Sequence, residues 1–295
     1  MNNEVGRIGF FYAVTQIHAG KGFDVGIVDQ PIQREIHTRF PVINGVKGAI
    51  RNEISRLIKI NYNDIKQIFG TEFQDNEASE AGKVSFSEAK IAFYPVRSID
   101  RGIVWITCPL ILSRLKIAFD VVGLEEFKKL IEKMNISYKE DYKALSTIKD
   151  STKICLEEFE QDIEYSEDLM GFVNHLRNIF PDKRLFERFS SNLVILSDED
   201  FSYFVTNSTE VIARIRINPQ KRTVDKGALW YEEYIPQDSV LFFISKLLVN
   251  NADYLLKKID ELNSKFLNIG GNASIGKGIV YISFLPFKGE DKNEK

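Results

Sequence analysis

The chain has 295 residues, of which 44% are apolar, and a formal net charge of −3 at pH 7. This length is enough for one large domain or two small ones, and the apolar content can supply a core. The charge balance does not by itself indicate nucleic-acid binding, although binding depends on where cations lie rather than on their sum.

The cysteines and the first residues exclude several classes of protein. Cys108 and Cys155 lie far apart, without a CxxC pair, which excludes a disulfide framework and metal-ligand spacing. The opening residues MNNEVGRIGFFYAV lack the pattern of a signal peptide, and no apolar run reaches membrane-spanning length. We therefore expect a soluble, cytoplasmic protein with no membrane partner.

The first half of the chain predicts a strand, a long loop and a helix, followed by further strands and helices. Ile8–Val14 is a short apolar run typical of a buried strand, whereas residues 18–44 predict a loop of a length that usually carries function. Gly45–Ile60 has the helical period. The remaining predicted elements are strands at Val84–Phe86, Ala92–Val96 and Ile103–Thr107 and helices at Pro109–Asp120 and Leu124–Met134.

The second half predicts a hairpin between mixed elements. Residues 135–166 are polar and weakly periodic, and we interpret about 135–190 as an insertion. Asp198 is expected to cap the helix that follows, because its carboxylate can accept first-turn amides. Glu210–Ile217 and Ala228–Ile235 predict a β-hairpin around a polar tip. The other predicted elements are helices at Leu169–Phe180 and Asp253–Lys265 and strands at Leu193–Leu196, Val240–Leu248 and Gly278–Phe284.

Strands and helices mix without a regular βαβ repeat, which favours an α+β fold. A ferredoxin-like (RRM-type) core sheet with large insertions and a protruding β-hairpin fits this order. In the absence of a clean linker, we expect a single domain over residues 1–287 and a charged, disordered tail over 288–295.

Two glycine-containing segments stand out. Residues 18–51 read HAGKGFDVGIVDQPIQREIHTRFPVINGVKGAIR, with glycines that let a backbone approach a ligand and basic residues at a predicted helix start. Residues 270–278, GGNASIGKG, nearly spell a phosphate-binding P-loop but end in glycine where Ser or Thr belongs, and a strand pattern follows. We therefore reject nucleotide binding, which leaves a glycine-rich turn as the interpretation that the residues alone support.

These segments resemble the CRISPR-associated RAMP superfamily, and within it the Cmr-type backbone subunits of type III-B effector complexes. The strand LWYEEY at 229–234 also matches the family. The resemblance identifies the hairpin at about 210–235 as its thumb, which acts as a wedge in the guide–target duplex, and residues 270–278 as its glycine-rich loop near the RNA-binding face. The family implies a subunit that binds guide (CRISPR) RNA, assembles with copies of itself and other Cmr-type subunits, and cleaves target single-stranded RNA.

The resemblance implies a catalytic role for Asp29, which would recruit Mg²⁺ or Mn²⁺ to a phosphate while the RNA 2′-hydroxyl attacks. A turn-forming aspartate before Pro31 is the alternative. His18 is a candidate proton donor or acceptor, or a residue that only holds the loop. Glu232 and Tyr234 alternate onto one strand face, and the resemblance places both near the cleavage site.

Candidate RNA-binding residues are cations and glycines in the loop, the helix start, the hairpin and the second glycine-rich segment. Lys47 and Arg51 lie four apart on one helix face, where the alternative is a solvated basic surface. A solvated hairpin is likewise the alternative for the thumb. The full set is Arg34, Lys47, Gly48, Arg51, Arg214, Arg216, Gly270, Gly271 and Lys277.

The leading hypothesis is a backbone subunit that cuts target RNA at regular intervals in a reaction dependent on a divalent metal. One alternative is a guide-binding scaffold of the same superfamily that leaves cutting to a partner. Another is a guide-processing RAMP endoribonuclease that works without metal through a histidine.

Overall fold

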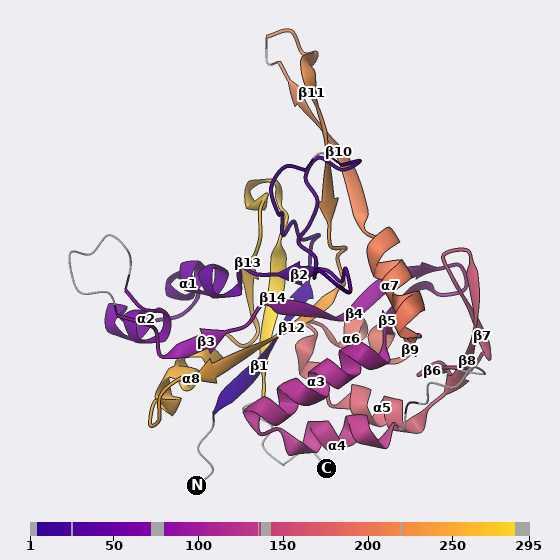
Figure 1. Ribbon diagram of the computed structural model, residues 1–295, viewed down its shortest axis with the longest axis horizontal. Coiled ribbons are helices and arrows are strands. Elements are labelled where there is room, and N and C mark those ends of the chain that lie inside the picture. Colours follow the sequence, from indigo (N-terminus) through magenta and orange to yellow (C-terminus); the bar gives the residue numbers. More distant parts are fainter. Residues whose placement is uncertain are drawn as a thin grey trace.

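A continuous twelve-stranded sheet runs through the computed structural model (Figure 1), which describes residues 5–24, 26–71, 80–134, 136, 143–218 and 220–286. A separate two-stranded hairpin stands apart from this sheet. The sheet strands are β1 (Gly6–Ala13), β2 (Val42–Ile43), β3 (Val84–Phe86), β4 (Ala89–Ser98), β5 (Gly102–Thr107), β6 (Ala144–Ser146), β7 (Lys153–Leu156), β8 (Phe159–Tyr165), β9 (Leu193–Ile195), β12 (Val240–Leu247), β13 (Lys265–Asn268) and β14 (Ile279–Leu285).

One half of the sheet is antiparallel, in the order β14-β1-β12-β4. Helices α1 (Val46–Leu57) and α2 (Tyr62–Phe69) come between β1 and β4 in the chain, and α8 (Asp253–Asp260) comes between β12 and β14. Every residue of β1 is buried, and a Cβ at Gly9 would lie 2.1 Å from the Phe243 ring. Glycine is therefore required where β1 and β12 pack most closely.

The other half closes on itself. Strands β4, β5, β9, β6, β8 and β7 pair in that order, and β7 pairs again with β4 at Ser98 and Leu156, which makes a six-stranded barrel-like sheet. The accompanying helices are α3 (Pro109–Val122), α4 (Glu125–Lys133), α5 (Glu167–Asn174), the 3₁₀ helix η1 (Arg177–Ile179) and α6 (Lys183–Ser190).

The region interpreted as an insertion contributes to this barrel. The described residues from 143 to 190 supply β6, β7 and β8, and Ile154, Leu156 and Ile163 are buried in the common core. Residues 135 and 137–142 lie outside the described part. The domain boundaries themselves stay a prediction.

The predicted hairpin is confirmed. Strands β10 (Glu210–Ile217) and β11 (Val224–Tyr234) pair antiparallel and project from the body of the molecule (Figure 1, orange). The hairpin begins just after α7 (Asp198–Asn207), so its base joins the body while its far end is exposed.

The α+β class is confirmed, and three local predictions need correction. Ser197, not Asp198, caps α7, since the Ser197 hydroxyl accepts the Asp200 amide at 3.0 Å. Asp198 instead accepts the Leu110 amide at 2.9 Å, in the first turn of α3. The helices expected at 169–180 and 253–265 both end earlier, at Asn174 and Asp260.

Among the described residues, no helix combines the length and the apolar character needed to cross a membrane. The charged tail predicted for residues 288–295 lies outside the described part of the chain.

Candidate active site

The long loop after β1 is joined by backbone hydrogen bonds to β11 at the base of the hairpin. The Gln30 amide donates to the Tyr231 carbonyl, and the Glu233 amide donates to the Gln30 carbonyl, both at 3.0 Å. The Tyr231 amide donates to Asp29 Oδ2 at 2.7 Å. This short parallel pairing places Asp29 beside the backbone of Tyr231 and Glu232 in β11. The catalytic roles of Asp29, Glu232 and Tyr234 stay predictions.

Asp29 is half-buried, and Oδ1 has no hydrogen-bond partner among the described residues. The described part of the chain contains no group of three or more His, Cys, Asp or Glu side chains that could hold a metal. One carboxylate oxygen fits Mg²⁺ or Mn²⁺ only if waters and RNA phosphate oxygens complete the shell, as is usual for Mg²⁺. The donor set therefore suits an ion recruited with substrate rather than a resident one.

Glu232 is the centre of a buried hydrogen-bond cluster. Its Oε1 accepts a hydrogen bond from the Trp230 indole N–H at 2.8 Å. Its Oε2 accepts one from the Tyr234 hydroxyl and one from the side-chain amide Nδ2 of Asn272 at 2.9 Å. Arg214 Nε lies 3.6 Å from Oε2. Burial raises the pKa of Glu232, but the hydrogen bonds from Tyr234 and Trp230 more than offset this, so the pKa is lowered. Glu232 is thus a hydrogen-bonded carboxylate at neutral pH.

Tyr234 is fully buried and shares its hydroxyl with Glu232 and with the Asn272 amide, which lies 3.2 Å away. Burial and the neighbouring carboxylate raise the pKa of Tyr234 to about 12. The phenol therefore stays protonated and acts as a donor. Asn272 was not singled out in the sequence, and its position in the GGNASIGKG segment was the available signal.

His18 is buried, and the two glycine-rich segments meet around it. Its Nδ1 lies 2.8 Å from the Glu233 carbonyl, and its own carbonyl accepts the Gly271 amide at 2.8 Å. A Cβ at Gly270 would lie 2.5 Å from that carbonyl, and Gly270 has a φ of 82°. Gly270 and Gly271 therefore allow close packing on His18, and contact with RNA stays a prediction for both.

Arg34 lies inside the protein rather than on a surface. Its guanidinium pairs with Glu233 at 2.5 Å, with side chains 8% and 9% exposed, and donates to the carbonyls of Arg39 and Val205. Glu233 also accepts the Thr209 hydroxyl at 2.8 Å. A phosphate contact would have to replace these bonds. Glu233 was missed in the sequence, although strand alternation places it on the face opposite Glu232.

The start of α1 is exposed and tied to the loop. Lys47 and Gly48 are exposed, Arg51 is half-buried, and no acidic residue occupies the first turn. A Cβ at Gly48 would meet nothing within 4 Å, so a ligand can approach the backbone there. Gln33 accepts the Asn44 amide at 3.0 Å, which fixes this helix start relative to the loop.

The remaining candidate cations divide into two groups. Arg216 is exposed on the hairpin, as are Lys221 and Arg222 at its end. Lys277 instead donates to Gln16 at 2.7 Å and lies 5.0 Å from the centre of the Tyr234 ring. Lys277 therefore lines the Glu232 cluster, and the exposed cations lie along the hairpin.

Comparisons with known proteins place the chain in a family. The family model described as RAMP superfamily matches residues 10–281. A Pyrococcus furiosus protein named CRISPR system Cmr endoribonuclease Cmr4 is 37% identical over 282 residues, covering 92% of this chain and 93% of that protein. A Saccharolobus solfataricus protein named CRISPR system CMR subunit Cmr4 is 28% identical, covering 94% and 95%.

Solved structures show the same fold. The crystal structure of oligomeric Cmr4 from Pyrococcus furiosus matches with a TM-score of 0.72 at 30% identity, covering 95% of this chain and 98% of that one. A chain of the type III-B Cmr-beta complex bound to cognate target RNA, solved by cryo-EM, matches in fold with a TM-score of 0.78 at 22% identity, covering 96% and 98%. The chain therefore belongs to the RAMP superfamily and, within it, to the Cmr4 family.

Proposed function

We propose that this chain is a repeating backbone subunit of a type III-B CRISPR ribonucleoprotein. In this role it binds guide RNA and cuts complementary target RNA at regular intervals, as a divalent-metal-dependent endoribonuclease of the cytoplasm. The observation that carries the proposal is the placement of the Asp29 carboxylate at the foot of an exposed, cation-bearing hairpin, beside the Glu232 cluster. The 37% identity to a protein named as an endoribonuclease supports the same activity.

The chemistry asks little of the protein if the RNA 2′-hydroxyl is the nucleophile. The chain then needs to hold one nucleotide so that this hydroxyl, the phosphorus and the leaving 5′-oxygen lie in line. Asp29 presents Oδ1 toward the phosphate, while its other oxygen is held by the Tyr231 amide. A divalent cation bound by Asp29 and RNA would supply stabilisation of negative charge on the phosphate.

The neighbouring side chains hold Glu232 and the loop in place. Tyr234 and Asn272 keep Glu232 ionised and immobile, so that it can accept a hydrogen bond from a ribose or fix Arg214 near a phosphate. His18 supports the loop through the Glu233 carbonyl, and an approach of its other ring nitrogen to RNA would make it a proton donor or acceptor.

Guide RNA would bind along the exposed start of α1, through Lys47, Arg51 and the backbone at Gly48, with Arg214 and Arg216 on the hairpin. We also infer that β14-β1-β12-β4 forms a ferredoxin-like (RRM-type) core. The support is the antiparallel order of these four strands, together with the place of the helices in the chain: α1 lies between β1 and β4, and α8 lies between β12 and β14. Further partners would be copies of this chain and other Cmr-type subunits.

The decisive variant is Asp29→Asn in the complex assembled with guide RNA. Asparagine retains shape but removes the charge that a hard cation seeks, so cutting of complementary RNA should stop while assembly and target binding persist. Asp24→Asn is the matched control, because Asp24 is an exposed carboxylate of the same loop paired with Lys21. Cutting at full rate by the Asp29→Asn complex would favour the guide-binding scaffold instead.

The nucleophile is tested in the RNA. A single 2′-deoxy substitution beside one scissile phosphate should block that cut alone, and cutting that survives would indicate an attacking water. Cleavage of precursor RNA by the isolated chain in EDTA would favour the guide-processing endoribonuclease, which needs no metal.

A further inference from the structure

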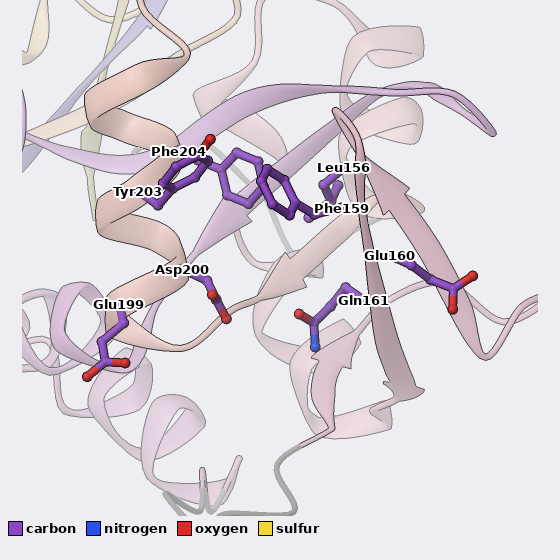
Figure 2. Close-up of a pocket in the computed structure, with 8 residues that line it drawn as sticks. All are labelled: Leu156, Phe159, Glu160, Gln161, Glu199, Asp200, Tyr203 and Phe204. Carbon is purple, nitrogen blue, oxygen red and sulfur yellow. The ribbon is translucent and has the colours of Figure 1, made fainter.

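An exposed aromatic pair lies in a pocket between β8 and α7 (Figure 2). The rings of Phe159 and Tyr203 meet edge to face, with centroids 5.2 Å apart, and each residue is 46% exposed. The pocket has a volume of about 310 Å³, and the buried residues Leu156 and Phe204 complete its apolar wall. Two half-exposed rings in one cavity leave aromatic surface available to a ligand.

The polar groups on the other side of this pocket are hydrogen-bond acceptors. Figure 2 shows the Asp200 carboxylate and the Gln161 amide facing each other below the rings. Glu160 and Glu199 line the pocket but point away from it. One Asp200 oxygen accepts the Ser197 hydroxyl at 2.8 Å, and the Gln161 nitrogen donates to a backbone carbonyl at 3.2 Å. The remaining oxygen of each side chain has no hydrogen-bond partner in the described part of the chain.

A second hollow of about 370 Å³ adjoins the first, because Phe159 and Tyr203 line both. Its walls include two further carboxylates, Glu157 and Glu158, and the last residue of α7, Asn207. Neither glutamate has an ion-pair partner among the described residues, and no lysine, arginine or histidine occurs among the residues that line the two hollows. The two hollows therefore offer acceptors at both ends and aromatic rings between them.

The geometry of α7 sets the distance between the two ends. Asp200, Tyr203 and Asn207 follow the spacing i, i+3 and i+7, so they lie on one face of this helix. The rise from Asp200 to Asn207 is about 10 Å, at 1.5 Å per residue. We refer to the cavity along this face as the α7 groove. A ligand that fills it needs a positive group at each end and an apolar segment between them.

We propose that the α7 groove binds a linear polyamine. One end ammonium donates to Asp200 and the opposite one to Glu158, while the methylenes and any central ammonium lie against the rings of Phe159 and Tyr203. A divalent metal ion would need its oxygen ligands gathered within a single coordination shell, and a single arginine side chain would occupy one end only. The α7 groove is separate from the loop that carries Asp29, so this inference does not rest on the proposed function.

Isothermal titration calorimetry of the full-length chain with spermidine, at low salt and without RNA, tests the ligand class. We expect saturable binding, and butylamine, which has one amino group, should bind about tenfold more weakly or worse because it occupies one end of the groove. Equal affinities for the two amines, or no binding of spermidine, would overturn the proposal. Tighter binding of N-acetylarginine amide than of spermidine would also overturn it and assign the groove to an arginine of a partner protein.

Two kinds of variant separate the rings from the charge. Phe159→Leu with Tyr203→Leu keeps apolar bulk but removes the ring faces, and it should lower the affinity for spermidine about tenfold. Asp200→Asn should lower it by a similar factor, because it removes the charge at one end.

Asp168→Asn is the matched control for Asp200→Asn. Asp168 is an exposed carboxylate in the first turn of α5, as Asp200 is in the first turn of α7, so both changes remove the same charge from the same kind of helix position. We expect Asp168→Asn to leave the affinity unchanged, and circular dichroism verifies that each variant is folded. Equal weakening by the two aspartate variants would show that spermidine responds to overall charge. That result, or full affinity after the loss of both rings, would overturn the proposal.

Discussion

Replacing Arg34 by methionine removes the cation from a buried ion pair and leaves the Glu233 carboxylate without it. The two side chains are 8% and 9% exposed, and the Arg34 guanidinium also donates to the carbonyls of Arg39 and Val205. Breaking such a pair by removing one partner costs about 3–5 kcal/mol, against about 1 kcal/mol or less for an exposed pair. We therefore expect Arg34→Met to lower the free energy of unfolding by about 3–5 kcal/mol, measured by urea denaturation at neutral pH.

The chain offers a matched control in a second buried pair. Arg7 donates to Asp260 at 2.9 Å, with side chains 1% and 7% exposed, between β1 and α8. Arg7→Met should destabilise the protein by a similar amount. Only the Arg34 pair holds the loop that carries Asp29, because Glu233 also accepts the Ile32 amide at 3.0 Å. Arg34→Met should therefore slow target cutting by the assembled complex, and Arg7→Met should not.

A double variant separates charge from packing. Arg34→Met combined with Glu233→Met removes both charges, so much of the lost stability should return while the loop remains loosely held. A loss below about 1 kcal/mol for Arg34→Met would show that the pair is solvated and would refute the reasoning. Equal slowing by the Arg7 and Arg34 variants would show that cutting follows overall stability instead of the position of the loop.

Three further predictions follow from the site. Lys47→Ala or Arg51→Ala should weaken RNA retention equally for unrelated guides and reduce the salt slope by about one unit per lost phosphate contact, measured by binding titrations at several salt concentrations; a changed preference among guides would contradict the assignment. Deleting the hairpin end, 218–227, should preserve folding but spoil the regular spacing of cuts on a sequencing gel, and unchanged spacing would exclude it as the wedge. Tyr234→Phe should raise the pKa of Glu232, followed by NMR of ¹³C-labelled glutamate, because it removes the strongest hydrogen bond that lowers this pKa. Since that pKa is lowered, Glu232 contributes stability above its ordinary value of 4.5 that is lost as the pH falls through the folded-state pKa, and the variant should lose part of this contribution.

Local sequence patterns were sufficient to predict those helices and strands whose type depends on residues that are neighbours in the chain. The apolar run at 8–14, the helical period at 45–60 and the two extended segments around a polar tip each predicted the element that forms. The resemblance carried by residues 18–51 and 229–234 then pointed to Asp29, Glu232 and Tyr234 together. Period and turn chemistry act over a few residues, so they can be recognised in the chain alone.

Tertiary pairing decided the rest. Residues 143–166 look polar along the chain, yet Ile154, Leu156 and Ile163 become buried once β7 meets β4 and the barrel closes. Arg34 was predicted to bind RNA, but its buried partner Glu233 lies 199 residues away. Asn272 reaches Glu232 across 40 residues. Whether a cation faces solvent or a carboxylate depends on which distant strand lies beside it, and that is a property of the folded sheet and not of any local window of the chain.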